Sequence, residues 1–314
     1  MAMMRLNAKQ VLARHDKALT KKEDFRSLYD EAYEFALPQR NLYDGYYDGG
    51  VQGQKKMNRV FDSTAINSTQ RFANRMQSGI FPPQRKWCRL EPGSDIPQDR
   101  KAEAQAALDA YGDKLFDTLK QSNFDIAIGE FLLDLCVGTA VMLVQPGDDT
   151  NPINFISVPQ FLVAFDEGAN GQVDNVYRRM KLKAESIQRQ WPDAEIPAEL
   201  KNLIDQKPTE EVELVEATVF DPERGDYCYH VIDKRSKTEL VYRRMDHTPW
   251  IVSRYAKVAG ETYGRGPLIT AMPDIKTLNK TLELVLKNAS LSISGVYTAA
   301  DDGVLNPNTV RIMP

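Results

Sequence analysis

One long amphipathic segment sets the strongest limit on the fold of this chain. From Leu268 to Ala289, apolar residues recur at alternating spacings of three and four positions. This spacing is typical of a packing seam along one side of a helix. At 1.5 Å per residue the helix would be about 33 Å long, whereas the rest of the chain is divided into short elements. We therefore expect a rod that belongs to an assembly. The apolar positions are Leu268, Ala271, Ile275, Leu278, Leu282, Val285 and Ala289.

The opposite face of the predicted helix carries a mostly positive stripe. It contains Lys276, Lys280 and Lys287, with Glu283 among them. One interpretation is a helix packed on its own domain, with the lysines in solvent. The other is one helix in a ring of identical helices, with the lysines near an enclosed channel. In the ring, five seam residues would pack between subunits, and the spacing alone does not choose between the two interpretations. These five residues are Leu268, Ile275, Leu278, Leu282 and Val285.

The composition is that of an ordinary globular protein. The chain has 314 residues, of which 42% are hydrophobic and 27% charged, enough for more than one core. Its net charge of -4 argues against a protein that coats nucleic acid. Affinity for phosphates comes mainly from clustered lysine and arginine, and a net acidic chain has less of it.

Cysteine usage and hydropathy favour a cytoplasmic protein without membrane spans. Cys88, Cys136 and Cys228 are odd in number and far apart, which predicts free thiols rather than disulfides or a zinc site. The most apolar stretch, Ile126 to Val144, contains Glu130 and Asp134. Each ionised carboxylate would cost about 2.5 to 3.5 kcal/mol at the centre of a bilayer. We therefore expect a buried helix followed by a buried strand, and no membrane partner.

The remaining patterns predict an α+β body, with helices first and a mostly antiparallel sheet or small barrel second. Helices are expected around Phe25–Ala36, from Asp62 or Ser63 to Ile80, and over Ala102–Leu119 and Phe124–Val137. From Ala140 onward the apolar stretches are short, β-branched or aromatic, and separated by Gly, Pro and Asp turns. The predicted strands are Ala140–Val144, Ile153–Val158, Val173–Leu182, Val212–Phe220, Tyr227–Ile232, Leu240–Arg244 and Trp250–Val258, with short helices over Ala184–Gln190 and Ala198–Asp205.

No arrangement of residues predicts catalysis, a metal site or a cofactor. There is no phosphate-binding loop, and the segment from Tyr263 to Gly266 lacks the spacing of a dinucleotide fingerprint, so we interpret it as a hinge. His15, His230 and His247 have no second ligand at metal-binding spacing, which favours ordinary structural roles. No catalytic residues are therefore predicted, and the leading interpretation is a protein that is not an enzyme, although carboxylates from distant segments could still be brought together in the fold.

A block of residues from Val60 to Leu90 resembles the head-to-tail connector, or portal, protein family of short-tailed bacteriophages. The block begins a helix at Asp62-Ser63-Thr64, ends it at Ser78-Gly79-Ile80, turns at Pro82-Pro83 and continues into a Trp87-Cys88-Arg89-Leu90 strand. Cys88 stands where an aromatic residue is commoner in the family. Further segments, including Gln190-Trp191-Pro192, are similar to the family's wing sheet.

The resemblance implies a division of the chain into parts of a portal subunit. Residues 1–262 correspond to the wing, with helices in 1–139 and mostly strands in 140–262. Residues 263–290 resemble the first stem helix, and residues 291–314 the beginning of the clip. The second stem helix and the crown are absent from this chain, so we expect it to be an ordered fragment of a longer protein.

The function that the resemblance implies is a structural conduit. Portal proteins form a ring, expected here to have twelve subunits, at one vertex of the capsid. Double-stranded DNA passes through it during genome packaging and ejection. The implied partners are the terminase large subunit, a tail adaptor, and the major capsid and scaffolding proteins. The implied locations are the virion and, during assembly, the host cytoplasm.

Two other functions remain as alternatives at this point. One is a metal-dependent phage enzyme that processes DNA with carboxylates gathered from distant segments. The other is a cytoplasmic adaptor that binds a partner through its long helix. A ring with a central hole would distinguish the portal from both.

Overall fold

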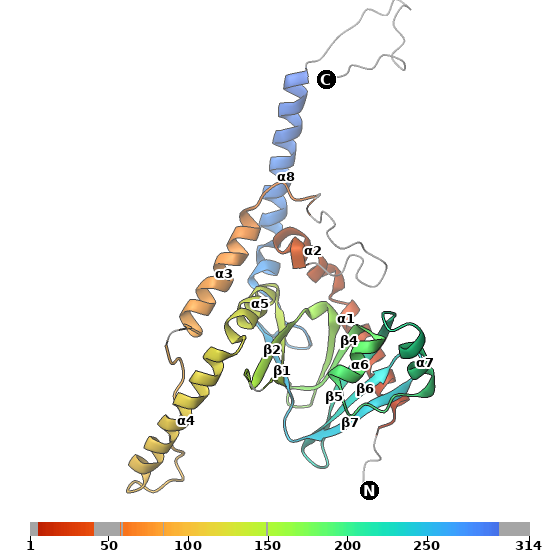
Figure 1. Cartoon of the computed structure of the whole chain (residues 1–314). Coiled ribbons are helices and arrows are strands. Elements are labelled where there is room, and N and C mark those ends of the chain that lie inside the picture. The colour runs from red at the N-terminus through yellow and green to blue at the C-terminus, as the bar shows by residue number, and fades with distance from the viewer. Residues whose placement is uncertain (1–5, 41–56, 58, 84, 149, 295–314) are drawn as a thin grey trace, which may run out of the picture.

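The protein is a mixed α+β molecule with one helix projecting far from the body (Figure 1). The computed structural model describes residues 6–40, 57, 59–83, 85–148 and 150–294. Within these residues the chain forms eight α-helices and two antiparallel sheets, which confirms the predicted α+β class. The helices are α1 (Ala8–Glu23), α2 (Arg26–Ala36), α3 (Thr64–Ile80), α4 (Lys101–Gln121), α5 (Phe124–Val137), α6 (Ala184–Gln190), α7 (Ala198–Gln206) and α8 (Pro267–Ser294).

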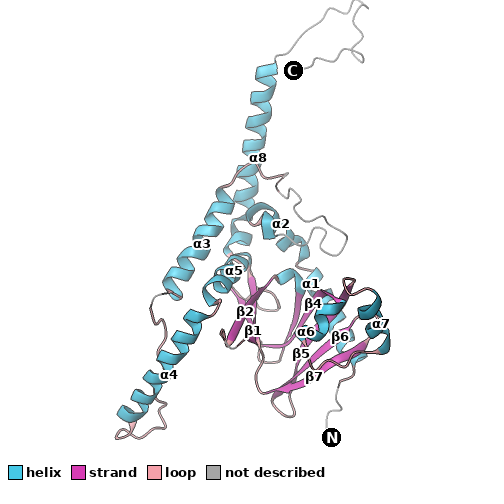
Figure 2. Cartoon of the chain, viewed as in Figure 1, coloured by secondary structure: helices cyan, strands magenta, loops and turns pink. Residues whose placement is uncertain are grey.

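The strands form two open sheets rather than a barrel. A three-stranded sheet has the order β2-β1-β8, and a five-stranded sheet has the order β3-β4-β5-β6-β7. Figure 2 shows the strands gathered on one side of the molecule and the longest helices on the other. The strands are β1 (Thr139–Pro146), β2 (Ile153–Val158), β3 (Val163–Glu167), β4 (Val173–Lys183), β5 (Glu211–Asp221), β6 (Asp226–Asp233), β7 (Thr238–Met245) and β8 (Trp250–Arg254).

Strand β1 is the central strand of the smaller sheet and follows directly on α5. Val141 lies opposite Val158 of β2 on one side and Val252 of β8 on the other. The predicted buried helix followed by a buried strand is therefore confirmed. The two sheets are joined through Trp250, whose indole N–H donates to Thr218 Oγ1 of β5 at 3.0 Å.

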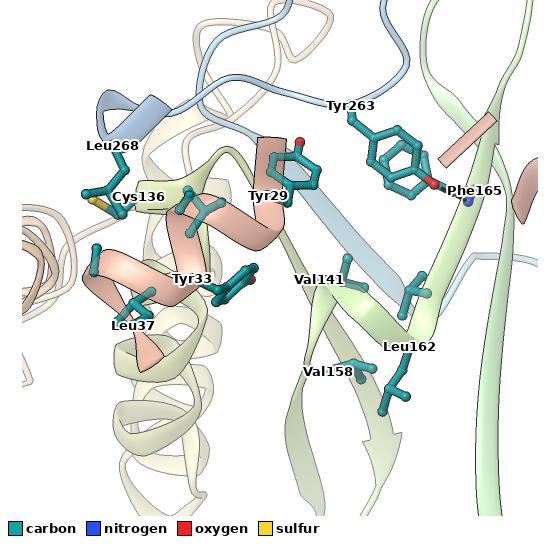
Figure 3. Close-up of a cluster of buried hydrophobic side chains, with 14 of the residues drawn as sticks. Tyr29, Tyr33, Leu37, Cys136, Val141, Val158, Leu162, Phe165, Tyr263 and Leu268 are labelled. Carbon is teal, nitrogen blue, oxygen red and sulfur yellow. Dashed lines mark hydrogen bonds between the residues drawn. The ribbon is translucent and has the colours of Figure 1, made fainter. Parts of the chain in front are cut away.

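The largest hydrophobic cluster lies where helices and sheets meet (Figure 3). It contains Tyr29 and Tyr33 of α2, Phe165 of β3, and Tyr263 and Leu268 at the base of α8. The rings of Phe165 and Tyr263 are 4.4 Å apart between centroids. Burying a large side chain of this kind is worth about 1.5 to 3 kcal/mol, so this cluster fixes the long helix to the body.

A buried lysine anchors α1 to the rest of the molecule. The Lys22 ammonium donates to the carbonyl oxygens of Gln160, Phe161 and Val163 at 2.7, 2.6 and 2.9 Å. Burial places the pKa of Lys22 well below its usual value. The three carbonyls satisfy all three N–H donors of the ammonium group, which is required for a charge at this depth.

A buried histidine on α1 makes the stability of the protein dependent on pH. Burial lowers the pKa of His15 from 6.5, and the nearby cations Arg179 and Lys234 lower it further, against the opposing effect of Asp16. The native state therefore binds this proton less readily than the unfolded chain does. The His15 contribution to stability is complete above about pH 6.5 and is lost as the pH falls, by up to about 1.4 kcal/mol per pH unit.

We expect the variant His15→Gln to lose less stability than the wild type between about pH 7 and about pH 5. Urea unfolding at each pH measures the two free energies of unfolding. His247→Gln serves as the control because His247 is exposed. Identical pH dependence in His15→Gln and in the wild type would contradict this assignment.

Candidate functional site

The projecting helix α8 is the most distinctive element of the molecule. It contains 28 residues, which corresponds to about 42 Å at 1.5 Å per residue. The sequence analysis assigned residues 263–290 to this helix, but it begins at Pro267 and continues to Ser294. Proline suits the first turn of a helix because the amide hydrogen that it lacks has no partner there. Of the predicted clip, residues 291–294 are helical and residues 295–314 lie outside the described residues.

The segment before α8, where a hinge was predicted, is a packed joint. Tyr263 is fully buried, and the Gly266 amide donates to the Val137 carbonyl at 2.9 Å. The Gly264 amide donates to Thr139 Oγ1 at 2.9 Å. These glycines allow two backbone segments to approach closely, and this is a packing role rather than one of mobility.

Gly266→Ala tests this joint. An added Cβ would overlap the Cys136 carbonyl oxygen and the Val137 backbone, neither of which belongs to a flexible side chain. We expect a loss of about 1 to 3 kcal/mol in the free energy of unfolding, measured with urea. Gly112→Ala is the matched control, because nothing lies within 4 Å of the added Cβ on α4. The free energy of unfolding of Gly112→Ala should not fall, because alanine is the better helix former by about 0.8 to 1 kcal/mol. Equal stability of Gly266→Ala and wild type would contradict the packed joint.

The apolar seam of α8 divides into a covered lower part and an uncovered upper part. Leu268 is buried and Ile275 is partly buried against the core of the body. Leu278 is 41% exposed and Val285 is 54% exposed, while Leu282 is partly buried. The same stripe therefore supports the fold at its base and presents apolar surface further along.

An apolar groove lies between α3 and the lower part of α8. Its volume is about 340 Å³, and its walls include Ala65 and Phe72 of α3 and Ala271, Ile275 and Leu278 of α8. These α8 residues belong to the seam. The groove therefore continues as the exposed stripe along the helix.

Asn279 fixes the chain that leads into α3 against α8. Its side-chain oxygen accepts from the amides of Phe61 and Asp62, at 2.7 and 3.3 Å. Its side-chain nitrogen donates to the Arg59 carbonyl at 2.8 Å. The sequence analysis missed this residue. An asparagine inside an apolar helical pattern was the available signal, because a buried amide needs partners.

The three lysines predicted to form a positive stripe all have carboxylate partners. Lys276 pairs with Glu31 of α2 at 2.7 Å. Lys280 and Lys287 both pair with Glu283, at 2.9 and 2.5 Å. Hydrogen bonds from Lys287 and Lys280 lower the pKa of Glu283, which keeps it ionised. Two carboxylates, Glu31 and Glu283, therefore offset two of the three lysine charges.

A buried ion pair holds α5 to the segment after α2. Arg40 donates to both carboxylate oxygens of Asp134, at 3.1 and 2.8 Å, and the Tyr33 hydroxyl donates to the same carboxylate at 3.0 Å. Burial raises the pKa of Asp134, while Arg40 and Tyr33 act in the opposite direction. This ion pair was not predicted from the sequence, where Asp134 stands out only as a charge in an apolar stretch.

Cys88, Cys136 and Cys228 are free thiols, as predicted. Among the described residues, no group of three histidine, cysteine or acidic side chains is placed to hold a metal ion. In the same part of the chain, no helix combines the length and the apolar character needed to cross a membrane.

Comparison with known proteins gives a class for this architecture. Residues 8–314 match the family described as bacteriophage head to tail connecting protein. A probable portal protein of Bordetella phage BPP-1 is 24% identical over 288 residues, which cover 86% of this chain and 50% of that protein. The portal protein of Enterobacteria phage T3 is 22% identical over 246 residues, which cover 75% and 45% of the two chains. The chain spans about half the length of these relatives.

The class is therefore that of phage connectors, proteins of the head-to-tail junction of the virion. This chain belongs to the bacteriophage head to tail connecting protein family. That family consists of structural portal proteins rather than enzymes, and the resemblance seen in the sequence is confirmed.

Proposed function

We propose that this chain forms part of a ring-shaped portal channel, expected to contain twelve copies, through which double-stranded DNA enters and leaves the capsid. In this proposal residues 1–262 are the wing and α8 is the first stem helix. Residues 291–314 lead into the clip. The proposed partners are the terminase large subunit, a tail adaptor, and the major capsid and scaffolding proteins.

The observation that carries the proposal is the uncovered continuation of the α8 seam. Leu278 lines the apolar groove, and Leu282 and Val285 continue the seam along α8 beyond the Asn279 contacts. Exposed apolar surface that is continuous with a groove is typical of a protein interface. Neighbouring copies of α8, packed side by side through this stripe, would cover it and close a ring.

The electrostatics suit a conduit that does not hold its cargo. The chain has a net charge of -4, and each phosphate contact would add affinity and slow the passage of DNA. In the ring, Lys276, Lys280 and Lys287 would lie in or beside the channel. Because each has a carboxylate partner, they would soften the repulsion of phosphate without binding it strongly.

Negative-stain electron microscopy of the purified protein tests the proposal. Rings with a central hole are the expected result. Particles of one or two subunits without rotational symmetry would contradict it and would favour an adaptor.

A further inference from the structure

A second basic surface, on α3, differs from the lysine stripe in its charge balance. From Thr64 to Leu90 the sequence contains five arginine or lysine residues and no acidic residue, although the whole chain is net acidic. This segment comprises α3 and an irregular stretch after it, and the strand predicted at Trp87-Cys88-Arg89-Leu90 does not form.

Among the described residues, two of the five cations pair with a carboxylate and three do not. Lys86 pairs with Asp113 of α4, and Arg89 pairs with Asp109 at 2.9 Å. The other three side chains are exposed. Within the part of the chain that the structure describes, they have no carboxylate at ion-pair distance. They are Arg71, Arg75 and Arg85.

Two of the three arginines, Arg71 and Arg75, lie on α3, on the side away from its buried residues, whereas Arg85 follows the end of the helix. Ala65, Thr69 and Ala73 are buried. Arg71 and Arg75 are one turn apart, about 6 Å along the axis, on the other side of the helix. Their exposed neighbours on this side are all polar, with amide or hydroxyl groups. These neighbours are Asn67, Asn74 and Ser78.

The chemistry of this face fits a polyanion better than a neighbouring protein. Guanidinium groups bind phosphates through paired hydrogen bonds, and amides and hydroxyls are the usual additional donors to a nucleic-acid backbone. The centre of a protein interface is instead depleted in charge and contains apolar anchors. This side of α3 offers uncompensated positive charge without such anchors.

We propose that the outer face of α3, defined by Arg71 and Arg75, contacts the phosphate backbone of double-stranded DNA. The inference rests on the proposed conduit function and adds a contact surface to it. The α8 lysines already contact carboxylates, Lys280 and Lys287 sharing Glu283, whereas Arg71 and Arg75 have no carboxylate at ion-pair distance among the described residues.

The test measures binding of a fluorescein-labelled DNA duplex by fluorescence anisotropy at several salt concentrations. The double variant Arg71→Gln with Arg75→Gln removes two charges from α3. The double variant Lys280→Gln with Lys287→Gln removes the same charge from α8. For the α3 variant, the slope of log affinity against log salt should become shallower by about two. Between about 50 and about 200 mM salt this corresponds to roughly a tenfold smaller loss of affinity. The α8 variant should change the slope by much less.

Several outcomes would overturn the proposal, and electron microscopy of the same samples separates them from failure of the conduit. Equal effects of the two variants would show a general charge effect. Wild-type rings without salt-dependent DNA binding would leave the conduit standing but remove this contact. Loss of rings in the α3 variant would assign the arginines to a contact between copies. If the wild type forms no rings, the conduit fails, and the anisotropy comparison still decides whether α3 binds phosphate.

Discussion

Leu282→Asp is expected to convert rings of this protein into single subunits. Leu282 lies in the middle of the α8 seam, between Leu278 and Val285. An aspartate there would have to be buried without a partner wherever two copies of α8 pack together, and burial of an unpaired charge is strongly unfavourable. Because the substitution recurs at every interface of the ring, assembly should be lost. Size-exclusion chromatography with light scattering, followed by negative-stain imaging, measures the result.

Leu284→Asp is the matched control for this variant. Leu284 is 51% exposed and lies on another side of the same helix. Both variants should retain the far-ultraviolet circular dichroism of the wild type, because neither residue is fully buried. Intact rings of Leu282→Asp would show that the seam does not pack between subunits.

Asp134→Ala is expected to cause the largest loss of folding stability. Removing this carboxylate leaves the Arg40 guanidinium without its buried partner and the Tyr33 hydroxyl without its acceptor. Breaking a buried pair by removing one partner costs about 3 to 5 kcal/mol. Urea unfolding of the purified variant gives the change in the free energy of unfolding.

Glu130→Ala provides the comparison on the same helix. Glu130 is also near Arg40, at 3.7 Å, but its side chain is 48% exposed. An exposed pair contributes about 0 to 1 kcal/mol, so this variant should remain close to the wild type. Similar losses in the free energy of unfolding of the two variants would mean that burial does not increase the contribution of the Asp134 pair to stability.

Much of the fold could be predicted because local patterns agree with the final structure. Ile153–Val158 and Ala184–Gln190 have the predicted bounds, and α5 begins and ends where the apolar pattern does. Strand β3, which follows a short 3-10 helix, was missed. The division into two sheets was also missed. It depends on pairing of β8 with β1, and a local pattern contains no information about such a distant partner.

The functional surfaces were harder to predict for the same reason. The seam of α8 could be predicted from the spacing of its apolar residues. The ion pair of Lys276 could not, because its partner Glu31 is 245 positions away in the sequence. The joint at Gly264 and Gly266 looked like a hinge because a sequence does not show which backbone a glycine approaches. The basic face of α3 had a readable signal, the absence of acidic residues from Thr64 to Leu90, but its exposure required the structure.

The joint beneath α8 has a mechanical consequence. The amides of Gly264 and Gly266 bond directly to the end of α5 and the start of β1, and the Tyr29 hydroxyl donates to the Gly264 carbonyl at 2.5 Å. A force applied at the far end of α8 is therefore transmitted directly to the β-sheets, because no flexible linker separates the helix from them. Tilting α8 relative to the body would require the buried tyrosines at its base to slide past one another, so we expect the helix and the body to move as one rigid unit.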